Sequence, residues 1–284
     1  MRVTVILTTL ERPIHILSFA TLILAAGAGC DVRPTTDGRP AVERAPFRAT
    51  HFEGTYTNHV QGICTDDSSV IYWSWTDRLA KTDLSGHTLA SIPVQRHHGD
   101  LCLHAGKLYV AVNLGAFNMP AGRADSWIFV YDAASLKELG RHPVPEVVHG
   151  AGGVAHHGGS FFVVGGLPKD APANYIYEYD ERFAFKKRHV LESGYTLMGI
   201  QTVARSNGAW WFGCYGKPKE LICADDSFRL KGRWDFDAAY GIVGLANGRM
   251  LVARDVAAGR GARTCSVSVA TVDPERGLTI IEDP

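Results

Sequence analysis

The sequence has no excess of charge of either sign, because 29 Lys and Arg residues balance 29 Asp and Glu residues. Without a basic surplus, bulk charge does not steer the chain toward nucleic acid or an anionic surface, so we expect no nucleic-acid partner. The sequence has no CxxC pair either, which argues against a thiolate zinc or redox site. A Ser/His/Asp order, a carboxylate pair and a nucleotide fingerprint are also absent. Function therefore has to be inferred from the organisation of the chain.

Only one long hydrophobic run is present, and it lies near the start of the chain. Residues 13–29 are uncharged but too few for a comfortable transmembrane span, which is typical of the apolar region of a signal peptide. The run ends in "GAGC", residues 27–30, which resembles the lipobox of bacterial lipoproteins, although Gly27 replaces their usual Leu. The resemblance implies acylation of Cys30; an ordinary cleaved signal peptide is the alternative. Either interpretation predicts an exported protein, periplasmic or on the outer cell surface, and the first adds a lipid as its only membrane contact.

The chain after the predicted signal peptide, residues 1–30, divides into two parts. Residues 31–46 are rich in Pro, Thr, Arg and Asp and have no periodicity, which predicts a flexible tether. Residues 47–284 are enough for one large domain, which we expect to be monomeric.

Five internal repeats indicate the fold of this domain. An apolar strand that ends in an aspartate recurs, as in "WIFVYD" and "YIYEYD", at steps of 49, 48, 45 and 48 residues. The aspartates are Asp83, Asp132, Asp180, Asp225 and Asp273. Two β-rich runs precede each of these strands and one follows it, and four-strand units at a spacing of ~48 residues are typical of a β-propeller.

We therefore predict an all-β fold, a five-bladed β-propeller with four antiparallel strands per blade. The segment "FRATHFEG", residues 47–54, is expected to pair with the last blade and close the ring, because an open edge strand is an aggregation liability. A β-sandwich is the structural alternative, but it does not predict so regular a repeat. The resemblance to propellers identifies a superfold and no particular function.

The first strand of every propeller blade lines a central channel, which predicts where chemistry can occur. The segments that lead into these strands contain four histidines together with amide, carboxylate and phenol groups. We predict catalytic roles for His149, His97 and Tyr240. The predicted substrate-binding residues, two of them rim arginines, are Gln61, Asp100, Asn113, Arg123, Gln201 and Arg254.

Three histidines from successive blades, His59, His98 and His149, are candidates for a metal site at the channel mouth. Neutral imidazole together with amide or carboxylate oxygen suits a divalent metal such as zinc or manganese. A satisfied, hydrogen-bonded ring of histidines is the alternative, since residues so far apart in sequence form no local metal motif.

Other residues have a structural explanation. We assign the glycines of "HGAGG", residues 149–153, to close backbone approach at a crowded axis, because a strand and not a phosphate-binding helix follows them. His104, His156 and His157 are expected at the surface. Four tryptophans are expected in the core, namely Trp73, Trp75, Trp210 and Trp211. Cys214 and Cys223 flank a turn, and a disulfide between them is left open.

The function that these features favour is an exported, membrane-tethered enzyme acting on a carbohydrate or similar small polar substrate at the channel mouth. A metal-assisted lyase or hydrolase, for example one acting on uronic acids, is its concrete version. A non-catalytic propeller lipoprotein that binds a ligand or a protein is the alternative. A third is a cyclotransferase, because plant-type glutaminyl cyclases are five-bladed propellers, although no Glu stands in the segments that lead into the first strands here.

Overall fold

The computed structural model describes residues 47–281, which lie in a compact unit spanning residues 44–284. The predicted signal peptide with Cys30 and the predicted tether lie outside the described residues. Within residues 47–281 no helix is long and apolar enough to cross a membrane.

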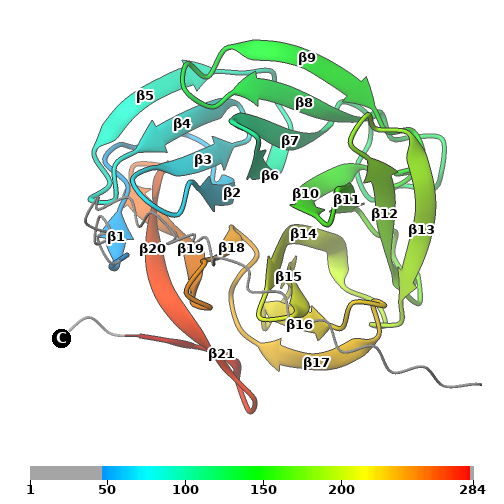
Figure 1. Cartoon of the computed structure of the whole chain (residues 1–284). Coiled ribbons are helices and arrows are strands. Elements are labelled where there is room, and N and C mark those ends of the chain that lie inside the picture. Colours follow the sequence, from blue (N-terminus) through cyan, green and yellow to red (C-terminus); the bar gives the residue numbers. More distant parts are fainter. Residues whose placement is uncertain (1–46, 282–284) are drawn as a thin grey trace, which may run out of the picture. The chain divides into compact units, whose positions relative to one another are not determined.

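In the described residues, twenty-one strands form five sheets, the blades of a propeller (Figure 1). Blade 1 consists of β2 (Val60–Thr65), β3 (Ile71–Trp75), β4 (Arg78–Thr82) and β5 (Thr88–Pro93). Blade 2 consists of β6 (His98–His104), β7 (Lys107–Asn113), β8 (Ser126–Asp132) and β9 (Glu138–Pro143). Blade 3 consists of β10 (Ala151–His157), β11 (Ser160–Gly165), β12 (Asn174–Asp180) and β13 (Phe185–Leu191). Blade 4 consists of β14 (Leu197–Ser206), β15 (Ala209–Tyr215), β16 (Glu220–Ala224) and β17 (Leu230–Asp235). Blade 5 consists of β18 (Ile242–Gly244), β19 (Met250–Gly259), β20 (Ala262–Asp273), β21 (Gly277–Ile280) and β1 (Thr50–His51).

The first strands of the blades surround the central channel. Contacts run from β2 to β6, β10, β14 and β18 in turn, and from β18 back to β2. All pairings within the blades are antiparallel. The strands follow one another in chain order from the channel outward, except that β1 also pairs with β20 in blade 5. The prediction of an all-β, five-bladed propeller with four antiparallel strands per blade is confirmed.

The N-terminal segment closes the ring, as predicted for residues 47–54. In β1, Thr50 pairs with Val267 of β20, while the other end of β20 pairs with β21. Next to β1, the ring of Phe52 is buried, and its centroid lies 5.3 Å from that of Trp73 and 5.5 Å from that of Trp75. Blade 5 is thus joined to blade 1 through a strand and an aromatic cluster that come from the start of the domain.

The repeated aspartates shape the turns between the third and fourth strands. Asp180 Oδ1 accepts hydrogen bonds from the backbone N–H groups of Arg182 and Ala184, both at 2.8 Å. Asp225 Oδ1 does the same with Ser227 and Arg229, both at 2.9 Å. These backbone hydrogen bonds favour the ionised carboxylate and lower the pKa of each aspartate. The repeated aspartates that predicted the fold therefore mark turns in which a carboxylate accepts hydrogen bonds from the backbone.

The four tryptophans are buried, which confirms their assignment to the core, and their exposed fractions are between 0% and 3%. The five cysteines within residues 47–281 are all free. In the antiparallel pairing of blade 4, Cys214 lies opposite Glu220 and Cys223 lies opposite Trp211, so the two thiols do not face each other. The disulfide that was left open is not formed.

Candidate functional site

The channel opens on one side into a cavity of about 350 Å³. All five blades contribute to its lining, which is formed by His59, Gln61, Thr76, His97, His98, Gly99, Asn113, Phe117, Ala151, Gly152, Met198, Gln201, Tyr215 and Tyr240. The volume falls within the range of about 300–1,000 Å³ that is usual for sites of small ligands.

β-Bulges at the start of the innermost strands direct polar side chains toward the channel. The pairing of β2 with β3 shifts between Val60 and Gly62, so Gln61 is the bulged residue. The pairing of β14 with β15 shifts likewise on both sides of Ile200, and Gln201 is a bulged residue there. A bulge re-aims a side chain that regular alternation would place elsewhere, and bulges are common beside functional sites.

Close backbone approach at the axis explains the glycines of these segments. A Cβ on Gly99 would lie 2.3 Å from the carbonyl oxygen of Gly152, and a Cβ on Gly62 would lie 2.1 Å from Asp100 Oδ1. Neither contact is sterically allowed. The glycines therefore allow neighbouring blades to meet, in agreement with the interpretation of "HGAGG" as a crowded segment and not a phosphate loop.

The polar floor of the cavity is a short hydrogen-bond network around His59. Its Nε2 lies 3.0 Å from the hydroxyl of Tyr215 and 3.0 Å from Nε2 of Gln61, which also donates to Thr76 Oγ1 at 3.1 Å. An amide nitrogen can only donate, so the His59 nitrogen is the acceptor in this arrangement. The ring of Tyr240 packs edge-on against His59, with centroids 5.5 Å apart.

The environment keeps this network neutral. Burial, with smaller contributions from the charges of Arg263 and Lys219, lowers the pKa of His59. Burial, followed by the neighbouring Tyr240 and Asp237, raises the pKa of Tyr215. A neutral imidazole thus faces a protonated phenol, which is an acceptor and donor pair within hydrogen-bond distance.

Cations lie behind the cavity wall and do not line it. Lys219 Nζ is 4.0 Å from the ring centroid of Tyr240 and 2.7 Å from Asp237 Oδ2. This cation–π contact and the ion pair help to hold the phenol ring of Tyr240 in place.

The other predicted amides have different surroundings. Gln201 is buried and its Nε2 donates to the carbonyl of Met198 at 2.8 Å, while no hydrogen bond to its Oε1 occurs within residues 47–281. Asn113 donates to Gly115 O at 2.9 Å and accepts from the N–H of Asp125 at 3.0 Å. Gln201 therefore keeps an acceptor for a ligand, whereas Asn113 is occupied in holding the loop between β7 and β8.

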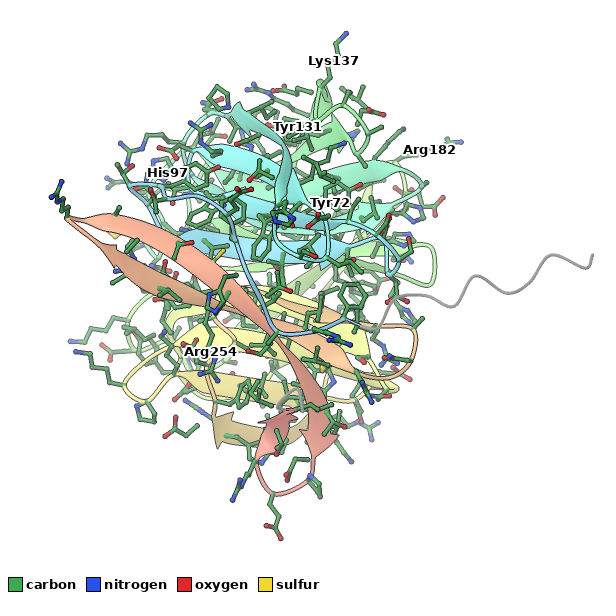
Figure 2. All side chains as sticks on the ribbon, turned by 90° about the vertical axis from the view of Figure 1, so that its left-hand side faces the viewer. Tyr72, His97, Tyr131, Lys137, Arg182 and Arg254 are labelled. Atoms are coloured by element: carbon green, nitrogen blue, oxygen red, sulfur yellow. The ribbon has the colours of Figure 1, made fainter. Side chains whose placement is uncertain are left out.

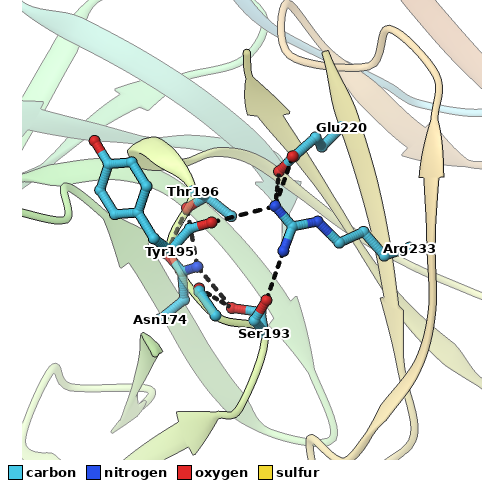
Figure 3. A network of polar contacts seen from close by, with 7 residues as sticks. Asn174, Ser193, Tyr195, Thr196, Glu220 and Arg233 are labelled. Atoms are coloured by element: carbon cyan, nitrogen blue, oxygen red, sulfur yellow. Dashed lines mark hydrogen bonds and ion pairs between the residues drawn. The ribbon is translucent and has the colours of Figure 1, made fainter. Parts of the chain in front are cut away.

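A second network fixes the segment that leads into β14 (Figure 3). Asn174 Nδ2 donates to Ser193 Oγ and Thr196 Oγ1, both at 2.9 Å. Arg233, paired with Glu220, donates to the carbonyl of Ser193 at 2.7 Å. Blades 3 and 4 thus clamp the residues just before Met198 and Gln201.

Asp100 lies deeper in the channel than the cavity and is fully buried. Its Oδ2 accepts a hydrogen bond of 2.9 Å from the N–H of Val203 in blade 4, and its Oδ1 has no partner. Burial raises the pKa of this carboxyl well above its ordinary value. Its position beneath the cavity makes Asp100 a link between blades, not a residue of the ligand-facing wall for which it was predicted.

The three imidazoles of the predicted metal site do not converge. The buried ring of His98 points into blade 2, with Nε2 2.8 Å from the hydroxyl of Tyr131, and burial lowers its pKa to about 4. His149 Nδ1 donates to the carbonyl of Met119 at 2.9 Å and so fixes the β7–β8 loop. His59 bonds to Tyr215 and Gln61 instead. Within residues 47–281, no group of three metal-ligating side chains lies at the cavity.

The remaining predicted residues differ in their relation to the cavity. His97 is exposed at the mouth and lines it, in a left-handed conformation with φ 76°. His149, Arg123 and Arg254 are not among the lining residues. Figure 2 shows Arg254 on blade 5, well apart from His97. The predicted catalytic set of His149, His97 and Tyr240 is therefore not brought together, since only the last two reach the cavity.

Several lining residues, among them Thr76, Phe117 and Met198, were not predicted as site residues from the sequence. Thr76 follows β3, Phe117 comes from the β7–β8 loop, and Met198 precedes the bulge of β14. Loops between second and third strands open on the same side of a propeller as the channel mouth, so Thr76 and Phe117 occupy positions that the repeat indicates. Met198, with φ 63°, owes its position to backbone geometry that the sequence does not signal.

Comparison with known proteins shows no family for this chain. No protein-family model matches the chain, and no curated protein matches it significantly. Among solved structures, the WD40 repeats of RRP9 are 11% identical, with 84% of each chain covered and a TM-score of 0.48. The structure of U3-55K is also 11% identical, with 82% of this chain and 84% of that chain covered and a TM-score of 0.48. A protein of unknown function from Bacteroides caccae is 14% identical, with 68% and 69% covered and a TM-score of 0.44. Likeness at this level transfers no function, and the propeller assignment rests on the strand order of the chain.

Proposed function

We propose that the protein binds a small, uncharged polar ligand of the carbohydrate type in the cavity at the channel mouth. The observation that carries the proposal is the chemistry of the lining. Phenol, phenyl, imidazole and amide groups surround the cavity, and none of its lining residues within the described part of the chain is Asp, Glu, Lys or Arg. Aromatic rings with a few convergent polar groups suit a ring that has an apolar face and a hydroxyl edge.

The lack of cations at the wall narrows the ligand class. A uronate carboxylate that moved from water into this cavity would meet no cationic side chain in the lining, and burying an unpaired charge is costly. Arg123 and Arg254, which were expected to hold such a carboxylate, lie outside the lining. Neutral sugars are therefore proposed in place of uronic acids.

Calorimetric titration with matched neutral and acidic sugars tests this proposal. We expect neutral mono- or disaccharides to bind and the corresponding uronic acids to bind at least tenfold more weakly. Tyr240→Ala and Phe117→Ala each remove a ring from the wall and are expected to weaken binding roughly tenfold, or about 1.4 kcal/mol. Tyr195→Ala is the control, because this exposed ring lies outside the cavity. Equal affinity for acidic and neutral sugars, or unchanged affinity in both cavity variants, would contradict the proposal.

A second candidate function is catalysis by proton transfer on the bound ligand. The 3.0 Å contact between neutral His59 and protonated Tyr215 favours it, because the imidazole can take a proton while the phenol gives one. Elimination and hydrolysis both need such a pair. His59→Gln is expected to abolish turnover of a bound sugar and to leave its affinity within a few fold, whereas His97→Gln retains turnover. If no sugar that binds is converted to a product, catalysis is refuted and the protein is a binding module.

We also propose that the chain is exported and held at the membrane by a lipid on Cys30. The support is the sequence alone, namely the uncharged run followed by "GAGC". Mass spectrometry of the protein from membrane fractions is expected to give Cys30 as an acylated N-terminal residue, and Cys30→Ser is expected to release the protein in soluble form. An unmodified mature N-terminus elsewhere would refute the anchor.

A further inference from the structure

Two histidines and a glutamate meet at the end of the channel opposite the cavity. His104 is the last residue of β6, the strand whose first residue, His98, lines the cavity. His156 lies near the end of β10, the first strand of the next blade, and Glu181 follows β12 in the same blade. The fold therefore brings together Glu181 and two histidines that were expected at the surface, and it does so across the boundary between blades 2 and 3.

The geometry of these groups is close to that of a coordination shell. His104 Nε2 lies 3.7 Å and His156 Nε2 lies 3.5 Å from the same carboxylate oxygen, Glu181 Oε1. One ligating atom from each residue lies within 4.8 Å of the others. Tetrahedral ligands at the usual zinc bond lengths of about 2.0–2.1 Å are about 3.3–3.4 Å apart. Small side-chain rotations therefore convert the observed arrangement into three metal ligands.

Both imidazoles are held by packing, and the polar contact of the buried one is long. The rings of His104 and His156 stack with centroids 3.6 Å apart and planes 23° apart, and the ring of Phe161 packs edge-on against both. His156 Nε2 is buried, and its contact with Glu181 Oε1 at 3.5 Å is longer than an ordinary hydrogen bond. A buried nitrogen so weakly paired is uncommon, and a bound ion is one of the groups that satisfies it.

Imidazole and carboxylate are both common ligands of divalent transition metals. The carboxylate of Glu181 supplies the single negative charge of the set, and its side chain is exposed enough, at 58%, to move toward an ion.

We propose that His104, His156 and Glu181 bind a divalent transition metal, with zinc as the ion that two imidazoles and one carboxylate suit best. Three protein ligands leave the fourth tetrahedral position to water or to an exogenous ligand. The ion also ties blade 2 to blade 3, because one ligand comes from blade 2 and two come from blade 3. This site is separate from the cavity, and its existence does not depend on the proposed sugar ligand.

Zinc titration of the full chain without a histidine tag, after removal of metals with a chelator, tests the site. We expect one zinc ion per chain with a dissociation constant in the micromolar range or tighter, and a rise in the thermal midpoint when zinc is added. Cobalt in place of zinc is expected to give the visible absorption bands of a tetrahedral site. His156→Ala and Glu181→Gln are each expected to weaken zinc binding at least tenfold and to abolish the thermal shift.

His157→Ala is the matched control. The next residue in the strand faces the other way, with its ring 5.8 Å from that of Trp210, so its removal is expected to leave zinc binding unchanged. Glu181→Gln changes only an exposed side chain, so a failure of His156→Ala to fold does not remove the test. The proposal is overturned if the wild-type chain binds no stoichiometric zinc, or if neither variant binds it more weakly than wild type.

Discussion

Asp100 provides the most quantitative prediction, because it is a fully buried carboxyl in the centre of the propeller. In β6, Asp100 lies between residues that line the cavity, His98 and Gly99, and residues that line a second pocket, Leu101 and Leu103. Its Oδ2 accepts a hydrogen bond from the N–H of Val203, across the channel in blade 4. Substitution by Asn keeps the shape and the accepting oxygen and removes the ability to ionise.

The magnitude follows from proton linkage. Burial raises the pKa of Asp100 in the folded state well above its ordinary value, so the folded protein holds a proton that the unfolded chain loses above about pH 4. The free energy of unfolding then falls as pH rises, by about 1.4 kcal/mol per pH unit, and levels off at the pKa of the folded state. Below the folded-state pKa of Asp100, Asp100→Asn is therefore expected to gain up to about 1.4 kcal/mol per pH unit relative to wild type as pH rises.

Urea unfolding of both proteins at half-unit steps of pH measures this gain. The difference between the two free energies isolates Asp100, because the other titrating groups are shared. Asp225→Asn is the control: the pKa of this exposed carboxyl is lowered, so it is ionised in both states over this range and its substitution leaves the slope unchanged. A stability difference between wild type and Asp100→Asn that stays constant from pH 5 to pH 7 would show that the carboxyl is ionised in the fold and would refute the reasoning.

Three further predictions follow from other parts of the molecule. Phe52→Ala empties an aromatic cluster that closes the ring, and it is expected to cost roughly 3–5 kcal/mol in the free energy of unfolding, measured by urea titration, with the exposed Phe185→Ala near neutral. Asp225→Ala is expected to lower the thermal midpoint of unfolding. Asp225→Asn, whose side-chain oxygen still accepts from the N–H groups of Ser227 and Arg229, is expected to lower it much less. Equal decreases in the two variants would contradict the turn assignment. Because the pKa of His59 is lowered by burial, sugar affinity is expected to be constant down to about pH 6.5 and to weaken only when the imidazole is protonated at lower pH. In the His59→Gln variant, the loss of sugar affinity at low pH is expected to disappear.

The fold was predictable because its signal is local and repeated. Each turn aspartate makes the same hydrogen bonds to backbone N–H groups a few residues later, so the same residue recurs at the same place in every blade. The closing strand was predictable for a related reason, since a ring with an unpaired edge would expose backbone groups.

The candidate site was predictable only in part. The register of the repeat located His59, Gln61, Gln201 and Tyr240 at the cavity, because it fixes which residues begin the innermost strands. It did not fix where a side chain points. The ring of His98 turns into its own blade toward Tyr131, and both orientations are compatible with the same sequence pattern.

Contacts between blades were the least predictable part. His149 bonds to a loop of the preceding blade, and the stacking of His104 on His156 depends on how closely blades 2 and 3 approach. Neither the hydrogen bond of His149 nor the stacking of His104 on His156 follows from strand periodicity or from a local motif. Both depend on the packing of glycines and aromatic rings from different repeats.

A crystal structure of the chain with the neutral sugar that binds most tightly tests the central claim most directly. The account predicts density for one sugar in the cavity, in contact with the rings of Phe117 and Tyr240 and within hydrogen-bond distance of Gln201 Oε1. Density for the sugar at any other surface, with this cavity left without it, would contradict the account.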